Sequence, residues 1–305
     1  MKVGLLGPPG RDEIRRLAIR LEERGVETVA LDPRPDPRFR VEGTVVEALG
    51  VDLSGLAGLY VADLGIRSPW RRTAAGTADL PASREALAAS RRHLAAWNTV
   101  LQVLDDRGLR VVNPPAAHDL HALKPWEVHV YARRGIPHPE TLATSDPDVP
   151  AALPGDVPRV TKGMVGGHGF TEAYVPGSGA PPLPLLVQER VGQVDVRAFV
   201  LAGKVIAAAE IRSTDPVDSR RGATRVRPLD PPRQVVEAAL AAATCWRMPF
   251  CAVDLRRDRS GEIAVLECNS APFFAAFERR TGLDVAGPLA DFLCGRGRLR
   301  EEASA

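Results

Sequence analysis

Cys251-Ala-Val-Asp-Leu-Arg256 and Ala264-Val-Leu-Glu-Cys-Asn269 are the two segments that decide the fold of this chain. Both are rich in Val, Leu, Ala and Cys, which is typical of buried strands. The residues between them are polar and include Gly261, which can adopt the positive φ of a tight turn. The two segments therefore predict a β-hairpin.

The predicted hairpin carries three oxygen-bearing side chains. Because side chains alternate along a strand, we expect Glu267 and Asn269 on one face, where Asp254 can join them from the neighbouring strand. Such hard oxygen donors suit magnesium that carries substrate phosphates. A loop or solvent-exposed position is the alternative for each residue taken singly. Two carboxylates and an amide inside apolar strands favour a metal site.

The composition is that of an ordinary globular protein. The chain has 305 residues, of which 45% are hydrophobic and 26% are charged, enough to bury a substantial core. No apolar run approaches the roughly 18 to 20 residues of a membrane span, and the N-terminus lacks the pattern of a signal peptide. Four scattered cysteines without metal-ligand spacing indicate reduced thiols. We expect a cytoplasmic protein with no membrane partner.

Net charge gives no indication of a nucleic-acid partner. The formal value of +2 is a small remainder of many charges of both signs. The sequence also lacks a basic stripe interleaved with aromatic residues. We therefore expect no nucleic-acid binding, and the sequence leaves a homo-oligomer open.

The N-terminal region predicts a separate domain. Residues 3–31 follow the pattern strand, helix, strand, which implies a βαβ unit and a parallel sheet. A long amphipathic helix over 81–107 and a strand near 110–113 complete a domain of ordinary size. Gly4, Gly7 and Gly10 match neither the Walker nor the dinucleotide-binding spacing.

Two lysines are notable because arginine is the usual cation in this sequence. Lys162 ends a predicted strand and precedes a loop with four glycines, Gly163, Gly166, Gly167 and Gly169. Such a loop lets backbone N–H groups approach an anion, and the lysine adds a point charge. A flexible hairpin tip is the equally weighted alternative. Lys124 lies in a helix predicted over 118–134, where a lone lysine is usually solvated.

Further candidates follow the glycine-rich loop. The apolar strand that ends in Gln188, Glu189, Arg190 and Val191 is expected to leave main-chain polar groups free for the edge of a purine, with Glu189 or Asp195 near the ribose. The guanidinium groups of Arg197 and Arg212 could clamp a carboxylate or phosphate. A surface arginine is the alternative for each, including those of the Arg-Gly loop that contains Arg221.

The order of these features resembles the ATP-grasp superfamily and, within it, the RimK-like amino-acid and peptide ligases. The motifs that carry the resemblance are Asp195-Val-Arg-Ala-Phe-Val-Leu-Ala-Gly-Lys-Val-Ile, Cys251-Ala-Val-Asp-Leu and Val265-Leu-Glu-Cys-Asn-Ser-Ala-Pro272. The resemblance covers about residues 113 to 295. Gly163, where a proline is common in the family, and Asp218, where an asparagine is expected, depart from the pattern.

The resemblance implies an ATP-grasp fold, of mixed α/β and α+β class, with an N-terminal Rossmann-like (pre-ATP-grasp) βαβ domain. It also implies a domain organisation along the chain. The expected parts are an N-terminal domain at 1–113, a small lobe with the glycine-rich loop at 114–190, a C-terminal lobe with the metal site at 191–295 and a charged tail at 296–305.

The resemblance also implies roles for the candidate residues. Asp254, Glu267 and Asn269 would hold Mg²⁺, with Glu267 bridging two ions and Mn²⁺ as an alternative metal. Arg197, Arg212 and Arg221 would stabilise the phosphates or an acyl phosphate. The expected ATP-binding residues are Lys124, Lys162, Gly163, Gly166, Gly167, Gly169, Gln188, Glu189, Arg190, Val191 and Asp195.

The activity implied is that of an ATP-dependent carboxylate–amine ligase. Such an enzyme forms an amide or peptide bond through an acyl phosphate, and we expect it to add an amino acid to a small molecule, a peptide or a protein tail. Its partners would be ATP, a carboxylate substrate and an amine acceptor. Two alternatives remain open: a kinase built on the same nucleotide site, and a non-catalytic ATP-binding regulatory protein.

Overall fold

The computed structural model describes residues 1–34, 38–66, 72–73, 76–165, 170–177, 183–222, 224–258 and 260–296. These residues divide into two compact units. The first unit contains residues 1–115, 273–275 and 286–296, and the second contains residues 116–272 and 276–285. Segments far apart in the sequence therefore meet within the first unit.

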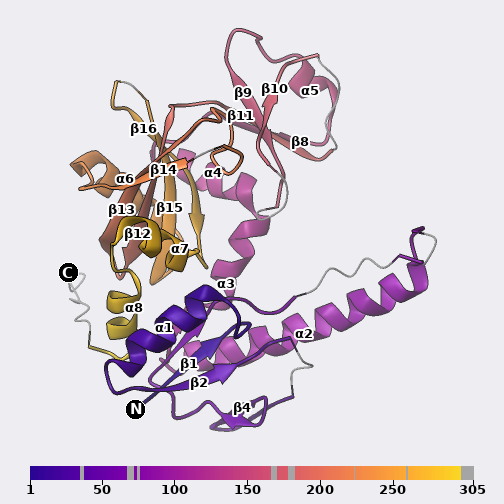
Figure 1. Ribbon diagram of the computed structural model, residues 1–305. Helices are drawn as coiled ribbons and strands as arrows, with labels where there is room; N and C mark the ends of the chain where they lie inside the picture. Colours follow the sequence, from indigo (N-terminus) through magenta and orange to yellow (C-terminus); the bar gives the residue numbers. More distant parts are fainter. Residues whose placement is uncertain are drawn as a thin grey trace. The chain divides into compact units, whose positions relative to one another are not determined.

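The first unit is built on a parallel sheet (Figure 1). Its strands, in the spatial order β2-β1-β6-β7, are β2 (Glu27–Leu31), β1 (Lys2–Leu6), β6 (Gly58–Val61) and β7 (Arg110–Val112). Helix α1 (Asp12–Glu22) connects β1 to β2, which pair in parallel, so the predicted βαβ unit is confirmed. Helix α8 (Ala286–Leu293) packs against α1.

Helix α2 (Leu80–Asp106) confirms the long amphipathic helix expected over 81–107. The carboxylate of Asp79 caps its N-terminus by accepting the N–H of Ala82 at 3.1 Å. Trp97, Leu101 and Leu104 are buried along one stripe of the helix. This stripe packs in the same core as Val46 and Ala48 of a strand that the sequence did not predict.

That unpredicted strand belongs to a small antiparallel sheet. Its members are β3 (Phe39–Glu42), β4 (Val45–Ala48) and β5 (Val51–Asp52). All four residues of β3 are exposed, and β5 has only two residues. Periodicity predicts strands of two to four residues poorly because so few positions do not establish a pattern.

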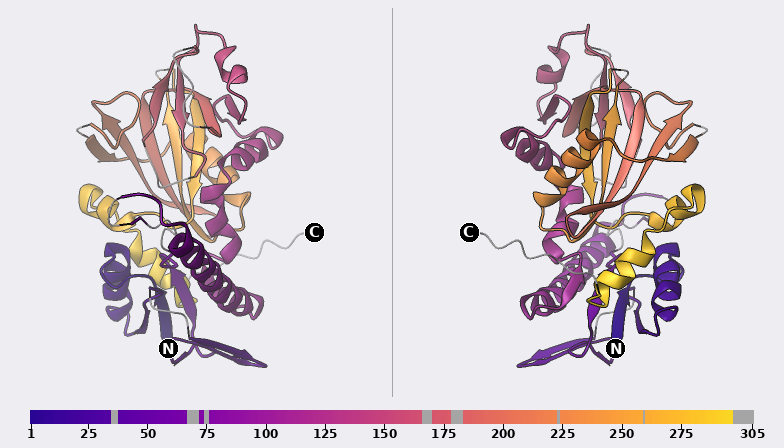
Figure 2. Two further views of the ribbon diagram at one scale, coloured as in Figure 1. Left: turned by 90° about the vertical axis from the view of Figure 1, so that its right-hand side faces the viewer. Right: turned by 90° about the vertical axis from the view of Figure 1, so that its left-hand side faces the viewer.

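The second unit contains two antiparallel sheets (Figure 2). The small sheet has the order β10-β9-β11-β8, with β8 (Thr141–Thr144), β9 (Arg159–Lys162), β10 (Glu172–Tyr174) and β11 (Leu185–Glu189). The large sheet has the order β14-β13-β12-β15-β16, with β12 (Val194–Leu201), β13 (Lys204–Ser213), β14 (Thr224–Pro228), β15 (Phe250–Arg257) and β16 (Ile263–Asn269). Strands β15 and β16 are antiparallel partners, so the predicted hairpin is confirmed.

Several short helices accompany these sheets. They are α3 (Pro115–His118), the 3₁₀ helix η1 (Asp119–Ala122), α4 (Lys124–Arg133), α5 (Asp148–Ala151), α6 (Arg233–Thr244) and α7 (Phe274–Thr281). The single helix expected over 118–134 is wrong. Pro125 disfavours a helix interior but suits the first turn, so α4 begins at Lys124 instead of running through it.

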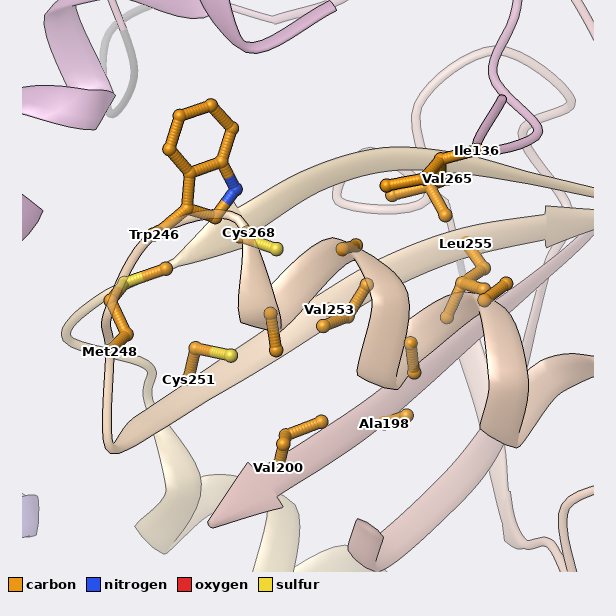
Figure 3. Packing of buried hydrophobic residues seen from close by; sticks show 14 of the residues in the cluster. Ile136, Ala198, Val200, Trp246, Met248, Cys251, Val253, Leu255, Val265 and Cys268 are labelled. Atoms are coloured by element: carbon orange, nitrogen blue, oxygen red, sulfur yellow. The ribbon is translucent and has the colours of Figure 1, made fainter. Parts of the chain in front are cut away.

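One face of the large sheet packs on helix α6 and forms the main core (Figure 3). Val200, Val253, Leu255 and Cys268 point from the strands into this core. Alanines dominate the facing side of α6, where Ala238, Ala239, Ala242 and Ala243 are buried together with Val235. Small side chains on the helix let it approach the β-branched and leucine side chains of the sheet closely.

The described residues contain no helix whose length and hydropathy would allow it to cross a membrane.

A second apolar contact holds α7 to the large sheet and yields a test of stability. Phe199 is fully buried, and its ring lies 4.6 Å from that of Phe277, centroid to centroid. We expect Phe199→Ala to lower the free energy of unfolding by about 3–5 kcal/mol, because the truncation leaves a cavity. Urea denaturation measures the loss. Val149→Ala is the control: Val149 is exposed, so a shift of at most about 0.5 kcal/mol is expected. Equal shifts in both variants would contradict the packing argument.

Candidate active site

A β-bulge in strand β16 determines which side chains face away from the core. Leu255 pairs with Val265, whereas the preceding residue, Asp254, pairs with Glu267, so Leu266 is an extra residue in β16. Val265 and Cys268 consequently both point into the core although they are three residues apart. The bulge turns Glu267 to the face that carries Asp254. We call this face of the large sheet, opposite α6, the site face.

The site face carries two cross-strand ion pairs between β12 and β15. Arg197 lies opposite Asp254 and donates to both of its carboxylate oxygens, at 2.7 and 2.8 Å. Asp195 lies opposite Arg256 and accepts its Nε–H at 2.6 Å. The polarity reverses from one pair to the next, so each strand presents one acid and one base. The proximity of Asp254 raises the pKa of Arg197 above its ordinary value, and the guanidinium stays charged.

Strand β16 adds Glu267 and Asn269 to this face. The side-chain amide of Asn269 donates to Asp254 Oδ2 at 2.9 Å. Glu267 forms an ion pair with Lys124 at the start of α4, with 2.9 Å between Nζ and Oε2. The structure therefore brings together Asp254, Glu267 and Asn269, as the hairpin predicted, and adds Arg197 and Lys124 to them.

Lys162 comes to this site from the small sheet. Its ammonium group donates to Oε1 of Gln188 at 2.8 Å, and the amide of Gln188 donates in turn to Thr141 at 3.0 Å. Burial lowers the pKa of Lys162 to about 8, an effect that the negative charge of Glu267 partly offsets. The interaction with Glu267 connects the small sheet electrostatically to the site face. At neutral pH Lys162 remains mostly protonated.

The segment at Gln188–Val191 differs from the expectation in its main chain. Three of its backbone N–H groups are engaged: Glu189 donates to Glu140, Arg190 to Pro158 and Val191 to Glu189. The expectation that this segment leaves its main-chain polar groups free is therefore wrong for these N–H groups. The chain crosses here from one sheet to the other. Two neighbouring segments accept the N–H groups of Glu189 and Arg190, and the N–H of Val191 is satisfied within the segment. The side chain of Gln188 is buried against Lys162.

Arg212 is not brought to the site face. Glu210 pairs with Val196 across β12 and β13, so Glu210 and Arg212 share the face of Val196, opposite Arg197. Arg212 forms an ion pair with Glu210, which also accepts from Arg257. Sequence spacing alone did not reveal this face assignment.

Arg221 lies in the loop after β13, beside the segment that follows the glycine-rich loop. Its guanidinium stacks 4.4 Å from the ring centroid of Phe170 and pairs with Glu172. Asp218 accepts the backbone N–H of Thr171 at 2.8 Å. Hydrogen bonds from Arg220 and Thr171 outweigh the effect of burial and lower the pKa of Asp218. The loop at 213–222 thus holds the chain at Phe170 and Thr171.

The glycine-rich loop is only partly described. Gly163 directly follows strand β9. Gly166, Gly167 and Gly169 lie outside the described residues.

Arg256 is a site residue to which the sequence assigned no role. It ends the predicted strand at 251–256, and β15 continues one residue further, to Arg257. The period-two pattern Val253, Asp254, Leu255, Arg256 was the available signal, because it places Asp254 and Arg256 on one face. Arg256 is also mostly buried and donates to Asp195, which the sequence placed near a ribose.

The arrangement suits phosphate chemistry. Four basic groups lie among the carboxylates of the site face. Arg197 and Arg256 belong to that face, and Lys124 and Lys162 approach it from other elements. The basic groups can bind phosphate oxygens, and the carboxylates with an amide oxygen provide a hard donor set for a divalent cation. Two sheets with such a set between them are typical of an enzyme that binds ATP and Mg²⁺ and follows the ATP-grasp architecture.

Comparisons with known proteins agree with this class. A sequence model of the RimK-like ATP-grasp domain matches residues 184–293. A probable alpha-L-glutamate ligase of Aliivibrio fischeri (strain MJ11) is 31% identical over 217 residues, which cover 64% of this chain and 70% of that protein. The beta-citrylglutamate synthase B of Danio rerio is 30% identical over 216 residues, 64% of this chain and 53% of that protein.

Solved structures extend the likeness over nearly the whole chain. The ATP-grasp ligase PsnB, complexed with a phosphomimetic variant of a minimal precursor, Mg and ADP, superposes with a TM-score of 0.81. It is 25% identical, and the match covers 96% of this chain and 98% of PsnB. The macrocyclase MdnC from Microcystis aeruginosa MRC, bound with the precursor peptide MdnA, has a TM-score of 0.76 at 14% identity, with 96% and 99% covered. The latter likeness shows the fold alone.

The fold and the relatives together define an ATP-dependent ligase that forms carbon–nitrogen bonds. The chain belongs to the RimK-like ATP-grasp family. The expected ATP-grasp fold with an N-terminal parallel-sheet domain is confirmed. ATP and Mg²⁺ are the nucleotide and metal of this class.

The lowered pKa of Lys162 predicts that nucleotide binding takes up protons in alkaline solution. Free Lys162 is largely neutral above about pH 8, and a bound phosphate favours its charged form. Isothermal titration with ADP at pH values above 8, in two buffers of different ionisation enthalpy, measures the uptake. Well below pH 8 the uptake from Lys162 should disappear, because the lysine is already charged.

Lys162→Arg is the matched control for this uptake. The guanidinium stays protonated throughout the range, so ADP binding to the variant should take up fewer protons at alkaline pH. The same uptake in the variant and the unmodified protein would exclude Lys162 as the source.

Proposed function

We propose that this ligase activates a substrate carboxylate with ATP and joins it to the amino group of an amino acid or peptide. The observation that carries the proposal is the site face, where Asp254, Glu267 and Asn269 adjoin Arg197 and Lys124. A metal-binding set next to phosphate-binding cations is what transfer of a phosphoryl group requires.

The nucleotide is proposed to lie between the small sheet and the site face. Lys124 and Lys162 contact its phosphates, and the backbone at Gly163 approaches them. Gln188, Glu189, Arg190 and Val191 line the adenine pocket. The engaged N–H groups of residues 189–191 leave purine recognition to carbonyl oxygens and side chains of that segment. Asp195 lies near the ribose, where Arg256 fixes its carboxylate.

The donor set of the site face fits magnesium. Asp254 and Glu267 are cross-strand neighbours. The side-chain amide of Asn269 donates an N–H to Asp254, so the amide oxygen of Asn269 can serve as a further metal ligand. We propose that these three residues hold two ions with Glu267 between them, and that Mn²⁺ can replace Mg²⁺. When bound, the metal supplies positive charge to the phosphate oxygens.

Positioning and charge neutralisation account for the proposed reaction. A carboxylate oxygen of the substrate attacks the γ-phosphorus, ADP leaves, and an acyl phosphate forms. The amine nitrogen then attacks the acyl carbon, phosphate leaves, and the nitrogen loses a proton. Arg197 and Lys162 neutralise charge on the transferring group, and Arg221 is proposed to assist from the neighbouring loop. This route requires no covalent nucleophile.

The acceptor is proposed to be an amino acid or a peptide. The curated relatives are named for glutamate and citrylglutamate chemistry. The solved structure of PsnB, which matches nearly the whole chain, contains a phosphomimetic variant of a minimal precursor. Screening amino acids and short peptides for ATP-dependent phosphate release, followed by mass spectrometry of the products, identifies the acceptor. Release of ADP without an equal amount of free phosphate, together with a phosphorylated product, would indicate a kinase instead.

The metal-binding roles give a direct test of the proposed function. We expect Glu267→Gln and Asn269→Ala to abolish Mg²⁺-dependent ADP release, because each removes an oxygen ligand that the metal needs. Circular dichroism should show an unchanged fold. Glu237→Gln is the control: this exposed glutamate of α6 pairs with Arg233, and its loss should leave turnover unaltered. Full turnover by either site variant would exclude that residue as a ligand.

A further inference from the structure

A buried carboxylate lies at the edge of the large sheet, against strand β16, which carries two of the proposed metal ligands. Glu127 of α4 is only 2% exposed. Its Oε1 accepts the hydroxyl of Tyr131 and the backbone N–H of Cys268, each at 2.6 Å. The roles proposed for ATP and metal binding do not involve Glu127. A buried acidic group is costly unless its hydrogen bonds compensate, so its contacts indicate what it does.

The contact with Cys268 is placed between two proposed metal ligands. Cys268 separates Glu267 from Asn269. Its side chain points into the core (Figure 3). The pairing of β16 with β15 places the side chains of Glu267 and Asn269 on the other face. Among the residues that the structure describes, strand β16 is the last strand of its sheet, and its outer N–H groups face away from β15. Glu127 accepts one of these groups and the carbonyl of Pro137 accepts another, from Val265 at 2.7 Å.

These two anchors bracket the β-bulge. Val265 and Cys268 are held, and Leu266 and Glu267 lie between them. A bulge disrupts the ladder locally, and its conformation therefore depends on contacts outside the ladder. The oxygen of Glu127 lies 2.6 Å from the Cys268 nitrogen, so its position determines where this part of the strand is held. Tyr131, whose ring packs against that of Trp246, donates its hydroxyl to the same oxygen and holds Glu127 in place.

We propose that Glu127 is a positioning residue of the metal site: by accepting the Cys268 N–H it fixes the strand conformation in which Glu267 and Asn269 face the metal together. This inference rests on the proposed metal-binding roles of Glu267 and Asn269. Glu127 acts through the backbone, as an outer partner that orients ligands, and touches neither metal nor substrate. Such partners affect metal affinity nearly as much as some ligands do.

The nearby charges are consistent with a geometric role. Burial raises the pKa of Glu127 to about 7, while the hydrogen bonds from Tyr131 and Cys268 act in the opposite direction. Glu267 further raises this pKa and Lys124 lowers it. The oxygen accepts both hydrogen bonds whether or not the other carboxylate oxygen carries a proton. The position of the acceptor oxygen is therefore the property to vary.

Two conservative substitutions separate position from charge. Glu127→Gln removes the charge but keeps an acceptor oxygen at the same distance from the backbone. Glu127→Asp keeps the charge, but its side chain is one methylene shorter, so its oxygen lies farther from the Cys268 N–H. Isothermal titration of the ADP-bound protein with Mg²⁺ measures metal affinity directly. We expect Glu127→Asp and Glu127→Ala to weaken Mg²⁺ binding by about 10- to 100-fold. Glu127→Gln should change it by less than about threefold, because its amide oxygen still accepts both hydrogen bonds.

A structural control distinguishes positioning from loss of stability. Glu13 in the first unit is equally buried at 2% exposure and also accepts a backbone N–H, from Ala275 at 3.3 Å. Glu13→Ala should lower the melting temperature without changing Mg²⁺ affinity. ADP affinity without metal should be the same in all Glu127 variants. If Glu127→Ala does not fold, the Asp and Gln variants decide the question.

Asn269→Ala separates failure of this inference from failure of the proposed metal site. If Asn269→Ala loses Mg²⁺ binding while Glu127→Asp binds Mg²⁺ as tightly as the unmodified protein, the positioning role is overturned and the proposed metal site is retained. Unmodified affinity in Asn269→Ala would overturn both. Weak binding by Glu127→Gln together with normal binding by Glu127→Asp would show that charge matters and would also overturn the inference.

Discussion

The candidate site depends on one constraint, the strict alternation of side chains across the β15–β16 ladder and its single interruption at Leu266. One face of the ladder must bury Val253, Leu255 and Cys268 against α6. The opposite face is then available to polar residues, and the bulge brings Glu267 there beside Asp254. Hydrophobic burial on one side thus dictates the composition of the charged side, because each strand position has only one orientation.

The charges on the site face form a set that is already compensated without ligands. Arg197 holds Asp254, Lys124 holds Glu267 and Arg256 holds Asp195. In the proposed function the same groups exchange partners: phosphate oxygens attract the cations, and the divalent metal attracts the carboxylates. Groups that are already oriented need little rearrangement at the moment of reaction, which is the main source of electrostatic catalysis.

The sequence predicted what depends on local pattern and missed what depends on tertiary contact. The βαβ unit, the helix at α2 and the hairpin follow from periodicity and turn residues, and the three oxygen donors follow from that hairpin. The family resemblance supplied the remaining roles. The bulge at Leu266 depends on packing and on backbone contacts such as those of Glu127. The break in the expected helix over 118–134 has a local signal, Pro125, which was overlooked. Arg212 was assigned to the site because sequence order does not reveal which face of β13 it occupies.

The bulge also bears on how this segment can vary among related chains. Substitutions in the core beneath β16 change volume but leave each side chain on its own face. Leu266 is the extra residue, so its removal would leave a regular ladder in which Glu267 still lies beside Asp254 and Cys268 still points into the core. The segment can therefore lose one residue at this position without moving a proposed metal ligand to the other face. Relatives without the bulge should be one residue shorter there and should keep the acidic and amide residues two positions apart.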